Sequence, residues 1–372
     1  MYKFEDIIEE VKDFNSDLKY GLDDIVGVTI EKGLIPTIAN LTQTALDKFY
    51  IIKPETFVYN PRTHGVRLGM GYNDTCNTYI TSWNNVAFKV KKTAQNIVIP
   101  QYLWLYFCRP VWDRMTNFLA WGSSTIVFAW KDFLNIDIHL PSIEKQREIV
   151  SEYETLTRRI RLNEQMIEKL EATAQALYHK TFVAGIDKQN LPDGWRMGAL
   201  SDLANIVMGQ SPDGETYNME GVGMIFYQGR ADFGNRFPTP RVYTTDPTRY
   251  AKEGDLLLSV RAPVGDINIA PHGCCIGRGL AALRSKNNCQ SFLFYQMLEL
   301  EQVFNISDDD GTVFGSINKD DLYNIEIVIP TTQEMSSFEK QASIIDKEIK
   351  LKDKENNILT ELQSLLLAKI GQ

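Results

Sequence analysis

The chain has 372 residues, of which 44% are hydrophobic, and its formal net charge is -9 at pH 7. This length and composition predict a folded protein of two or three domains. The negative charge argues against a simple nucleic-acid binder, and the absence of an apolar run near ~20 residues excludes an ordinary membrane span. Because the acidic N-terminus is also unlike a signal peptide, we expect a cytoplasmic protein.

Residues 1–141 are predicted to form a first domain of mixed α and β structure. An acidic stretch with helical character opens it and covers residues 1–17. Alternating apolar residues then predict strands and one amphipathic helix. The strands are expected over residues 56–59, 66–70, 79–81, 86–90 and 136–140, and the helix over residues 101–116.

A long amphipathic helix is predicted next, over residues 142–185. Alternating steps of three and four residues define a coiled-coil seam that is apolar except at Asn163. No Pro or Gly interrupts residues 142–184, so the helix should reach ~60 Å, more than one compact domain needs. We therefore expect it to act as a spacer. Its seam positions are Ile149, Tyr153, Leu156, Ile160, Asn163, Ile167, Leu170, Ala174 and Leu177.

The remainder of the chain follows the same plan. Residues 186–330 predict a second mixed domain, and residues 331–372 predict a second spacer helix. The order of strands, one helix and a final strand matches the first domain. The strands are expected over residues 225–228, 255–260, 265–269, 279–283 and 325–329, and the helix over residues 290–303.

An internal repeat relates the two halves. The segment FLNIDIHLP, which begins at Phe133, is answered 189 residues later by LYNIEIVIP, which begins at Leu322. The same offset places Asn163 on Lys352, so each helix has one polar seam position, a feature that commonly sets register. If the first helix leads away from the first domain, the second must return beside it.

The expected fold class is α+β. Two mixed α/β globular domains are joined by two long helices that form an antiparallel coiled coil, in a dumbbell with pseudo-twofold symmetry.

Several motifs then resemble one family. They are LPDGWRMGALSD from Leu191, GDLLLSVRAPVGDINIA from Gly254, GRGLAAL from Gly277, and each final strand that runs through proline into a helix. In combination they are similar to the specificity subunit of type I restriction-modification enzymes over nearly the whole chain. The first half departs from the pattern because it lacks the Leu-Pro-x-Gly-Trp opening.

The resemblance implies a function for the predicted architecture. Each domain would be a target recognition domain that reads one half of a bipartite, gapped sequence in double-stranded DNA. The helices would set the gap and dock two modification subunits, and restriction (motor-nuclease) subunits would complete the complex. No cofactor is expected on this chain, whereas S-adenosylmethionine, ATP and Mg²⁺ are expected on the partner subunits.

Candidate DNA-contacting residues come from polar segments of the two domains. Arg can pair with guanine and Asn with adenine through two hydrogen bonds, and glycines allow close backbone approach. For each residue alone, a solvated loop position or a phosphate contact is the simpler explanation, whereas the groups carry more weight. The candidates are Arg62, His64, Arg67, Asn73 and Asn77 in the first domain, and Gln210, Ser211, Gln228, Arg230, Asn235, Arg236, Arg261 and Arg278 in the second.

The sequence carries no motif of an enzyme. A methyltransferase would need a glycine loop and a Pro-Pro-aromatic tetrapeptide, and nucleotide hydrolysis would need a G-x-x-x-x-G-K-[ST] loop; none is present. Asp346, Glu348 and Lys350 are better explained as a solvated helix face than as a nuclease site. The five cysteines suit neither a disulfide framework nor a zinc site, so no metal is expected.

Two other functions stay open at this point. A coiled-coil scaffold with duplicated protein-binding domains would show no sequence-dependent DNA affinity. A fused methylating or cleaving enzyme would transfer methyl groups by itself. The sequence does not predict the half-sites or the gap length, because loop shape decides base choice.

Overall fold

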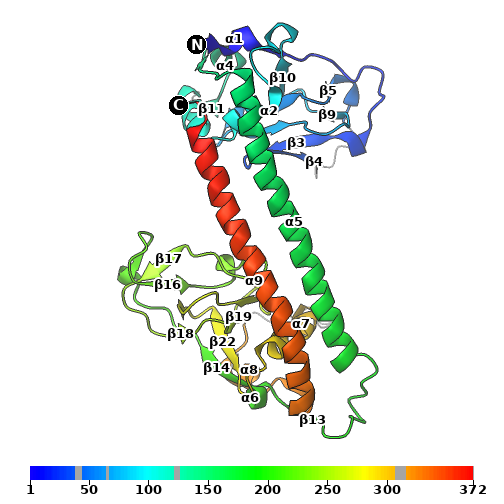
Figure 1. Cartoon of the computed structure of the whole chain (residues 1–372), viewed down its shortest axis with the longest axis vertical. Helices are drawn as coiled ribbons and strands as arrows, with labels where there is room; N and C mark the ends of the chain where they lie inside the picture. The colour runs from blue at the N-terminus through cyan, green and yellow to red at the C-terminus, as the bar shows by residue number, and fades with distance from the viewer. Residues whose placement is uncertain (38–43, 64–66, 121–125, 306–315, 372) are drawn as a thin grey trace. The chain divides into compact units, whose positions relative to one another are not determined.

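The computed structural model describes residues 1–37, 44–63, 67–120, 126–305 and 316–371, with the side chains of residues 301–305 excepted (Figure 1). The chain forms two compact units. The first comprises Met1–Asn163 and Glu355–Gln372, and the second comprises Glu164–Lys354. Each unit therefore contains a globular part and a portion of each long helix. Within the described residues, no helix is both long enough and apolar enough to cross a membrane.

The first unit is built on a six-stranded sheet in the order β2-β10-β6-β8-β3-β4. These strands are β2 (Ile8–Glu10), β3 (Val26–Thr29), β4 (Gly33–Pro36), β6 (Phe57–Tyr59), β8 (Met70–Tyr72) and β10 (Val86–Val90). Two-stranded pairs accompany the sheet: β1 (Tyr2–Lys3) with β12 (Asp137–Ile138), β5 (Tyr50–Ile52) with β9 (Tyr79–Thr81), and β7 (Arg62–Thr63) with β11 (Ile126–Val127). Short 3₁₀ turns lie at Leu22–Asp24, Leu46–Lys48 and Lys92–Ala94.

The first unit's helices pack on this sheet through an aromatic core. They are α1 (Phe4–Ile7), α2 (Pro100–Phe107), α3 (Pro110–Leu119) and α4 (Trp130–Leu134). Phe57, Phe88, Phe107 and Phe133 are fully buried, and the Phe57 and Phe88 rings stack with centroids 5.0 Å apart. Such aromatic burial dominates the energetics of a core.

Two expectations for this unit were wrong in detail. The single helix predicted over residues 101–116 is two helices, because Pro110 has no backbone N–H to continue α2 and instead begins α3. The strand predicted over residues 66–70 is β8 at Met70–Tyr72, and residue 66 lies outside the described residues.

The second unit contains two larger sheets. A four-stranded sheet has the order β14-β22-β19-β20, and a five-stranded sheet has the order β15-β17-β16-β21-β18. Their strands are β14 (Ala204–Met208), β15 (Tyr217–Asn218), β16 (Met224–Tyr227), β17 (Val242–Thr244), β18 (Tyr250–Ala251), β19 (Leu256–Ser259), β20 (Ile267–Ile269), β21 (Cys274–Ile276) and β22 (Leu280–Ser285). A separate pair joins β13 (Arg196–Ala199) to β23 (Glu326–Ile329). Short 3₁₀ turns lie at Gly214–Thr216 and Arg230–Asp232.

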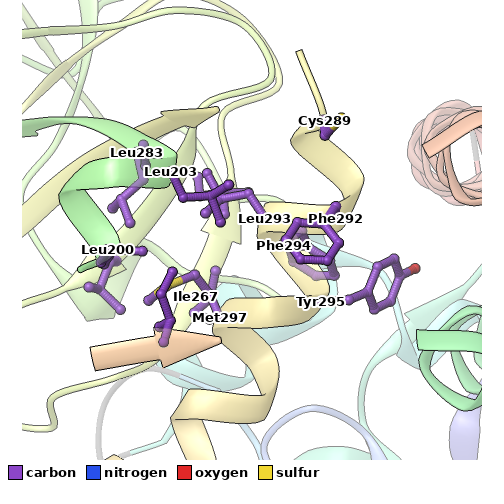
Figure 2. Close-up of a cluster of buried hydrophobic side chains, with 14 of the residues drawn as sticks. Leu200, Leu203, Ile267, Leu283, Cys289, Phe292, Leu293, Phe294, Tyr295 and Met297 are labelled. Atoms are coloured by element: carbon purple, nitrogen blue, oxygen red, sulfur yellow. The ribbon is translucent and has the colours of Figure 1, made fainter. Parts of the chain in front are cut away.

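The described residues of this unit form the shorter helices α6 (Leu200–Leu203), α7 (Gln290–Asn305) and α8 (Lys319–Tyr323). Figure 2 shows Leu200 and Leu203 of α6 gathered with Leu293 and Met297 of α7 and with Leu283 of β22. All five side chains are buried. The sheet and α7 therefore share one apolar core, as the alternating sequence pattern predicts.

The internal repeat is confirmed, and it includes the chain's first residues. The globular part of each unit opens with a strand, a four-residue helix and a second strand: β1, α1 and β2 in one, and β13, α6 and β14 in the other. The Asp6 carboxylate accepts a hydrogen bond from the Lys3 N–H at 2.8 Å, and the Asp202 carboxylate accepts one from the Ala199 N–H at 3.3 Å. Residues 1–17 are thus mainly strand and loop, and only Phe4–Ile7 of the expected helical stretch is helical.

The two long helices are α5 (Ile143–Phe182) and α9 (Thr332–Lys369), as expected. Every seam position from Ile149 to Leu177 is buried or partly buried, whereas most positions between them are exposed. In the first unit, Thr157 accepts a hydrogen bond from Gln363 at 2.7 Å and Asn163 donates one to Asn356 at 2.9 Å, so the helices run antiparallel.

The same direction holds in the second unit. There the rings of Tyr178 and Phe338 lie 5.6 Å apart, and Glu171 and Asp346 contact one arginine. The Lys352 ammonium, at the polar seam position of α9, lies 3.8 Å from the Glu348 carboxylate of the same helix.

Candidate nucleic-acid interface

Three loops of the second unit bring four of the predicted residues together. The N–H of Gln210 donates to the Ile276 carbonyl at 3.0 Å, and the N–H of Arg278 donates to the Ser211 hydroxyl at 3.3 Å. The third loop is held by the N–H of Gly277, which donates to the carbonyl of Tyr227, the residue before Gln228. Gln210, Gln228 and Arg278 are exposed, so these polar groups face solvent from adjacent segments.

Glycines make this close approach of three backbones possible. A Cβ at Gly209 would lie 2.1 Å from the Gly277 carbonyl oxygen, and one at Gly279 would lie 2.7 Å from the Gln228 oxygen. Since neither contact can be relieved by turning a side chain, any larger residue would force the loops apart. The glycines therefore hold Gln210, Ser211, Gln228 and Arg278 as one cluster, which we call the glycine-loop cluster.

Arg261 lies beside this cluster. The N–H of Val260 donates to the Gly279 carbonyl at 3.0 Å, which brings the following residue, Arg261, next to the glycine loops. Arg261 and Arg278 are both exposed. Within the described parts of the chain, no ion pair engages either guanidinium, so both can neutralise an approaching phosphate.

The loop between β16 and β17 contains Arg230 and Asn235, and both are exposed. The Arg230 guanidinium is hydrogen-bonded to the Asp266 carboxylate, which compensates much of its charge. Asp232, which is 3% exposed, also accepts hydrogen bonds from Arg241 and from the N–H of Gln228. The Arg230 guanidinium could therefore still contact DNA through hydrogen bonds, but it adds little net positive charge.

The structure places Arg236 elsewhere than expected. Its side chain is 4% exposed, and its guanidinium lies 3.3 Å from Glu171 of α5 and is hydrogen-bonded to Asp346 of α9. Burial by itself lowers the pKa of Arg236, but the neighbouring Asp346 carboxylate, with Tyr295 and Glu171, raises it overall. Arg236 is thus a buried cation and not a base-contacting residue, and Asp346 belongs to this ion pair and not to a solvated helix face.

In the first unit, Arg62 and Arg67 are exposed, as base- or phosphate-contacting residues must be. Arg62 lies in β7, and its N–H donates to the Asn60 side chain at 2.9 Å. His64 lies outside the described residues.

Asn73 was wrongly predicted to read bases. It is 1% exposed, its amide donates to the carbonyls of Ile52 and Asn77, and its side-chain oxygen accepts from the N–H and hydroxyl of Thr75. These contacts engage both ends of the amide, so nothing remains to pair with adenine. Asn77 itself is exposed.

Comparison with known proteins fits this duplicated arrangement. The family model described as the type I restriction modification DNA specificity domain matches residues 11–172 and again residues 192–364. The chain belongs to this family. The two matches fall on the two halves of the chain, and each specificity domain contains one set of candidate residues.

Two similar proteins are known from Methanocaldococcus jannaschii. One, assigned as the type I restriction enzyme MjaX specificity subunit, is 33% identical over 246 residues, 63% of this chain and 58% of that protein. The other, the type I restriction enzyme MjaIX specificity subunit, is 22% identical over 187 residues, 47% of this chain and 43% of that protein. The matched regions therefore span about half the length of these relatives.

A solved structure shares the fold. The S subunit of the type I restriction-modification system of M. genitalium has a TM-score of 0.63 and 15% sequence identity, and the alignment covers all of this chain and 95% of that one. At this identity the likeness concerns the fold alone.

The first specificity domain also contains exposed residues that the sequence did not indicate. Arg114 of α3 lines a cavity of about 510 Å³ together with Arg67 and the buried ion pair of Lys32 and Asp113, whose charged atoms lie 2.6 Å apart. Phe118, near the end of the same helix, is 87% exposed. Helical spacing alone made these residues look like parts of an ordinary amphipathic helix, so no sequence signal could have found them.

Proposed function

We propose that this protein is the DNA sequence-specificity subunit of a type I restriction-modification complex. Each specificity domain reads one half of a bipartite, gapped target, and the chain itself catalyses no reaction. The observation that carries the proposal is the duplication: the family model matches once in each half, and both halves offer exposed arginines. Phosphate contacts would position each domain, and contacts to base edges would supply the sequence preference.

The long helices support a second role, in docking modification subunits. Ile344, Leu351, Ile358 and Leu365 recur at seven-residue intervals on α9 and are 55–68% exposed. Beside this stripe in the first unit, Leu156, Leu362 and Leu366 line a groove of about 520 Å³. An apolar heptad stripe that faces water is characteristic of a surface that packs against another helix.

The charge balance supports a reader that works inside a larger assembly. Residues 186–330 hold nineteen acidic and twelve basic side chains, and ion pairs already engage Arg230, Arg236 and Arg241. Affinity for the phosphate backbone depends on cations, so partner subunits must supply much of that affinity.

In this proposal the modification subunits bring S-adenosylmethionine, the restriction subunits bring ATP and Mg²⁺, and the complex works in the cytoplasm.

Reconstitution of methyl transfer tests the proposal. Purified modification subunit, labelled S-adenosylmethionine and genomic DNA are combined with or without this chain. We expect methylation of adenine only when both proteins are present, and none with this chain alone. Methyl transfer by this chain alone would revive the fused-enzyme function, whereas no dependence on this chain would favour the coiled-coil scaffold.

A further inference from the structure

The buried guanidinium of Arg236 connects a recognition segment to three helices of the second unit. Arg236 lies in the loop between β16 and β17, and residues 228–241 are called here the recognition loop. Its guanidinium contacts Glu171 of α5 and Asp346 of α9, and its Cζ lies 4.3 Å from the centre of the Phe294 ring of α7. Since the side chain is 4% exposed, it cannot contact a DNA phosphate in this arrangement.

Hydrogen bonds fasten the recognition loop on both sides of Arg236 and at its beginning. The Asn268 side chain accepts from the Gly234 N–H at 3.1 Å and donates to the Gly234 carbonyl at 3.0 Å. The Arg236 carbonyl accepts from the Ile269 N–H at 2.8 Å. At the loop's other end, Asp232 accepts from the Gln228 N–H at 2.7 Å. Exposed Arg230 and Asn235 therefore lie in a loop whose neighbouring residues are held by hydrogen bonds.

A guanidinium suits this position for a geometric reason. It is planar and can donate to two carboxylates in fixed directions, whereas a lysine ammonium is a compact charge that cannot span both helices in the same way. Among the residues that the structure describes, its Nε nevertheless has no hydrogen-bond partner. Burying a cation is costly unless it is paired, so an apolar side chain would serve simple packing better.

A ligand-binding role fits the surroundings less well. The adjoining cavity of about 500 Å³ is lined by Arg230 and Arg236, but also by Glu171 and Asp266. The carboxylates offset both cations, so the cavity offers an anion no net attraction.

We propose that Arg236 is a positioning residue: by joining the recognition loop to α5 and α9, it determines how the second specificity domain presents its DNA-reading side chains. This inference rests on the proposed function and deepens it. Replacement of Arg236 should relax the choice of one half-site while the other half-site is read normally. A residue that only stabilises the fold would lower activity without that asymmetry.

The test measures methylation by the complex of this chain with its modification subunit. Duplexes carry the preferred target or single-base changes in either half-site, and the ratio of the two methylation rates gives the discrimination. The half-sites are assigned to domains with an Arg62→Gln, Arg67→Gln variant. We expect Arg236→Gln to lower discrimination at the second domain's half-site about tenfold, which is the effect expected from the loss of one base contact. Discrimination at the first domain's half-site should not change. Arg236→Lys should be intermediate.

Arg159→Gln is the matched control, because it removes an exposed ion pair with Glu355 on the same two helices. It should leave both half-sites unchanged. Thermal unfolding checks that each variant is folded. If Arg236→Gln does not fold, the same discrimination is measured with Asp346→Asn, which alters the partner of Arg236. Unchanged discrimination, or an equal fall at both half-sites, overturns the positioning role. If the unaltered chain confers no sequence preference at all, the proposed function fails instead.

Discussion

Arginine residues in this protein differ in what surrounds the guanidinium. Arg109 and Arg236 are buried: Arg109 donates to the Ile370 carbonyl at 2.5 Å, and Arg236 joins Glu171 and Asp346. Arg62, Arg67 and Arg278 are exposed. Buried arginines therefore stabilise the fold, whereas others face solvent. Only the exposed arginines can contact DNA.

Replacing Arg62 and Arg67 by Gln should affect one half-site only. Each lost bidentate contact to guanine would reduce base discrimination by ~1–3 kcal/mol, roughly 5- to 150-fold. Methylation of duplexes with changes in either half-site measures this. Lys53→Gln removes an exposed cation from the same unit and is the control. If both half-sites lose discrimination together, the two domains do not read DNA independently.

Asn73→Ala should destabilise the first unit. The variant leaves the carbonyls of Ile52 and Asn77 and the N–H of Thr75 without their side-chain partner, at a cost of ~1–3 kcal/mol for each buried group left unpaired. Denaturant unfolding followed by circular dichroism measures the loss. Asn77→Ala, which truncates an exposed side chain, should change the free energy of unfolding little. Equal stability of the two variants would contradict the structural role of Asn73.

At the level of elements, the sequence predicted long helices better than short strands. The seam from Ile149 to Leu177 repeats often enough to specify α5, and the offset of 189 residues identified α9. Strands such as β1 and β21 have only two or three residues, too few for an alternating pattern. They form because partners distant in the chain pair with them, which no local pattern encodes.

For the candidate site, too, the sequence predicted some features and missed others. The sequence indicated close backbone approach only for the glycines of residues 227–241, whereas the structure shows it at Gly209 and Gly279. Burial of Asn73 and Arg236 could not be predicted, because it depends on Ile52, Glu171 and Asp346, which are far away in the sequence. Base-reading residues on loops look alike in sequence whether tertiary contacts engage them or leave them exposed.

Asn163→Ala should weaken the pairing of α5 and α9. Asn163 is 2% exposed and donates to Asn356 at 2.9 Å, so its truncation leaves a partly buried amide without a partner and costs ~1–3 kcal/mol. The change is measured by denaturant unfolding. Arg159→Ala removes an exposed helix–helix ion pair four residues away and should have little effect. A larger loss with Arg159→Ala would contradict a seam organised around Asn163.

For the whole molecule, the last residues of the chain complete the core of the first unit. Ile370 is 2% exposed and packs, with Leu367, in the cluster that contains Phe107 and Trp112. The N-terminus lies in the same unit (Figure 1). The first unit is therefore assembled from both ends of the chain, and its stability depends on residues far from its own sheet.

Truncation after Leu366 should destabilise the first unit selectively. It removes Ile370 and the carbonyl that accepts from Arg109, and burial of one such apolar side chain contributes about 1.5–3 kcal/mol. Hydrogen exchange should rise in α2 and α3 and stay unchanged in α7. Leu365→Ala, at a position 55% exposed, is the control. An equal rise in hydrogen exchange in both units would show that the C-terminal residues do not stabilise the first unit specifically.

The most direct test of the central claim is single-molecule sequencing of methylated adenines in cells that express this chain with its modification subunit. Two domains that read DNA separately, joined by helices of fixed length, predict a bipartite motif with a gap of constant length. The Arg62→Gln, Arg67→Gln variant should alter one half of that motif and keep the gap. A contiguous motif, a variable gap, or methylation that ignores this chain would contradict the account.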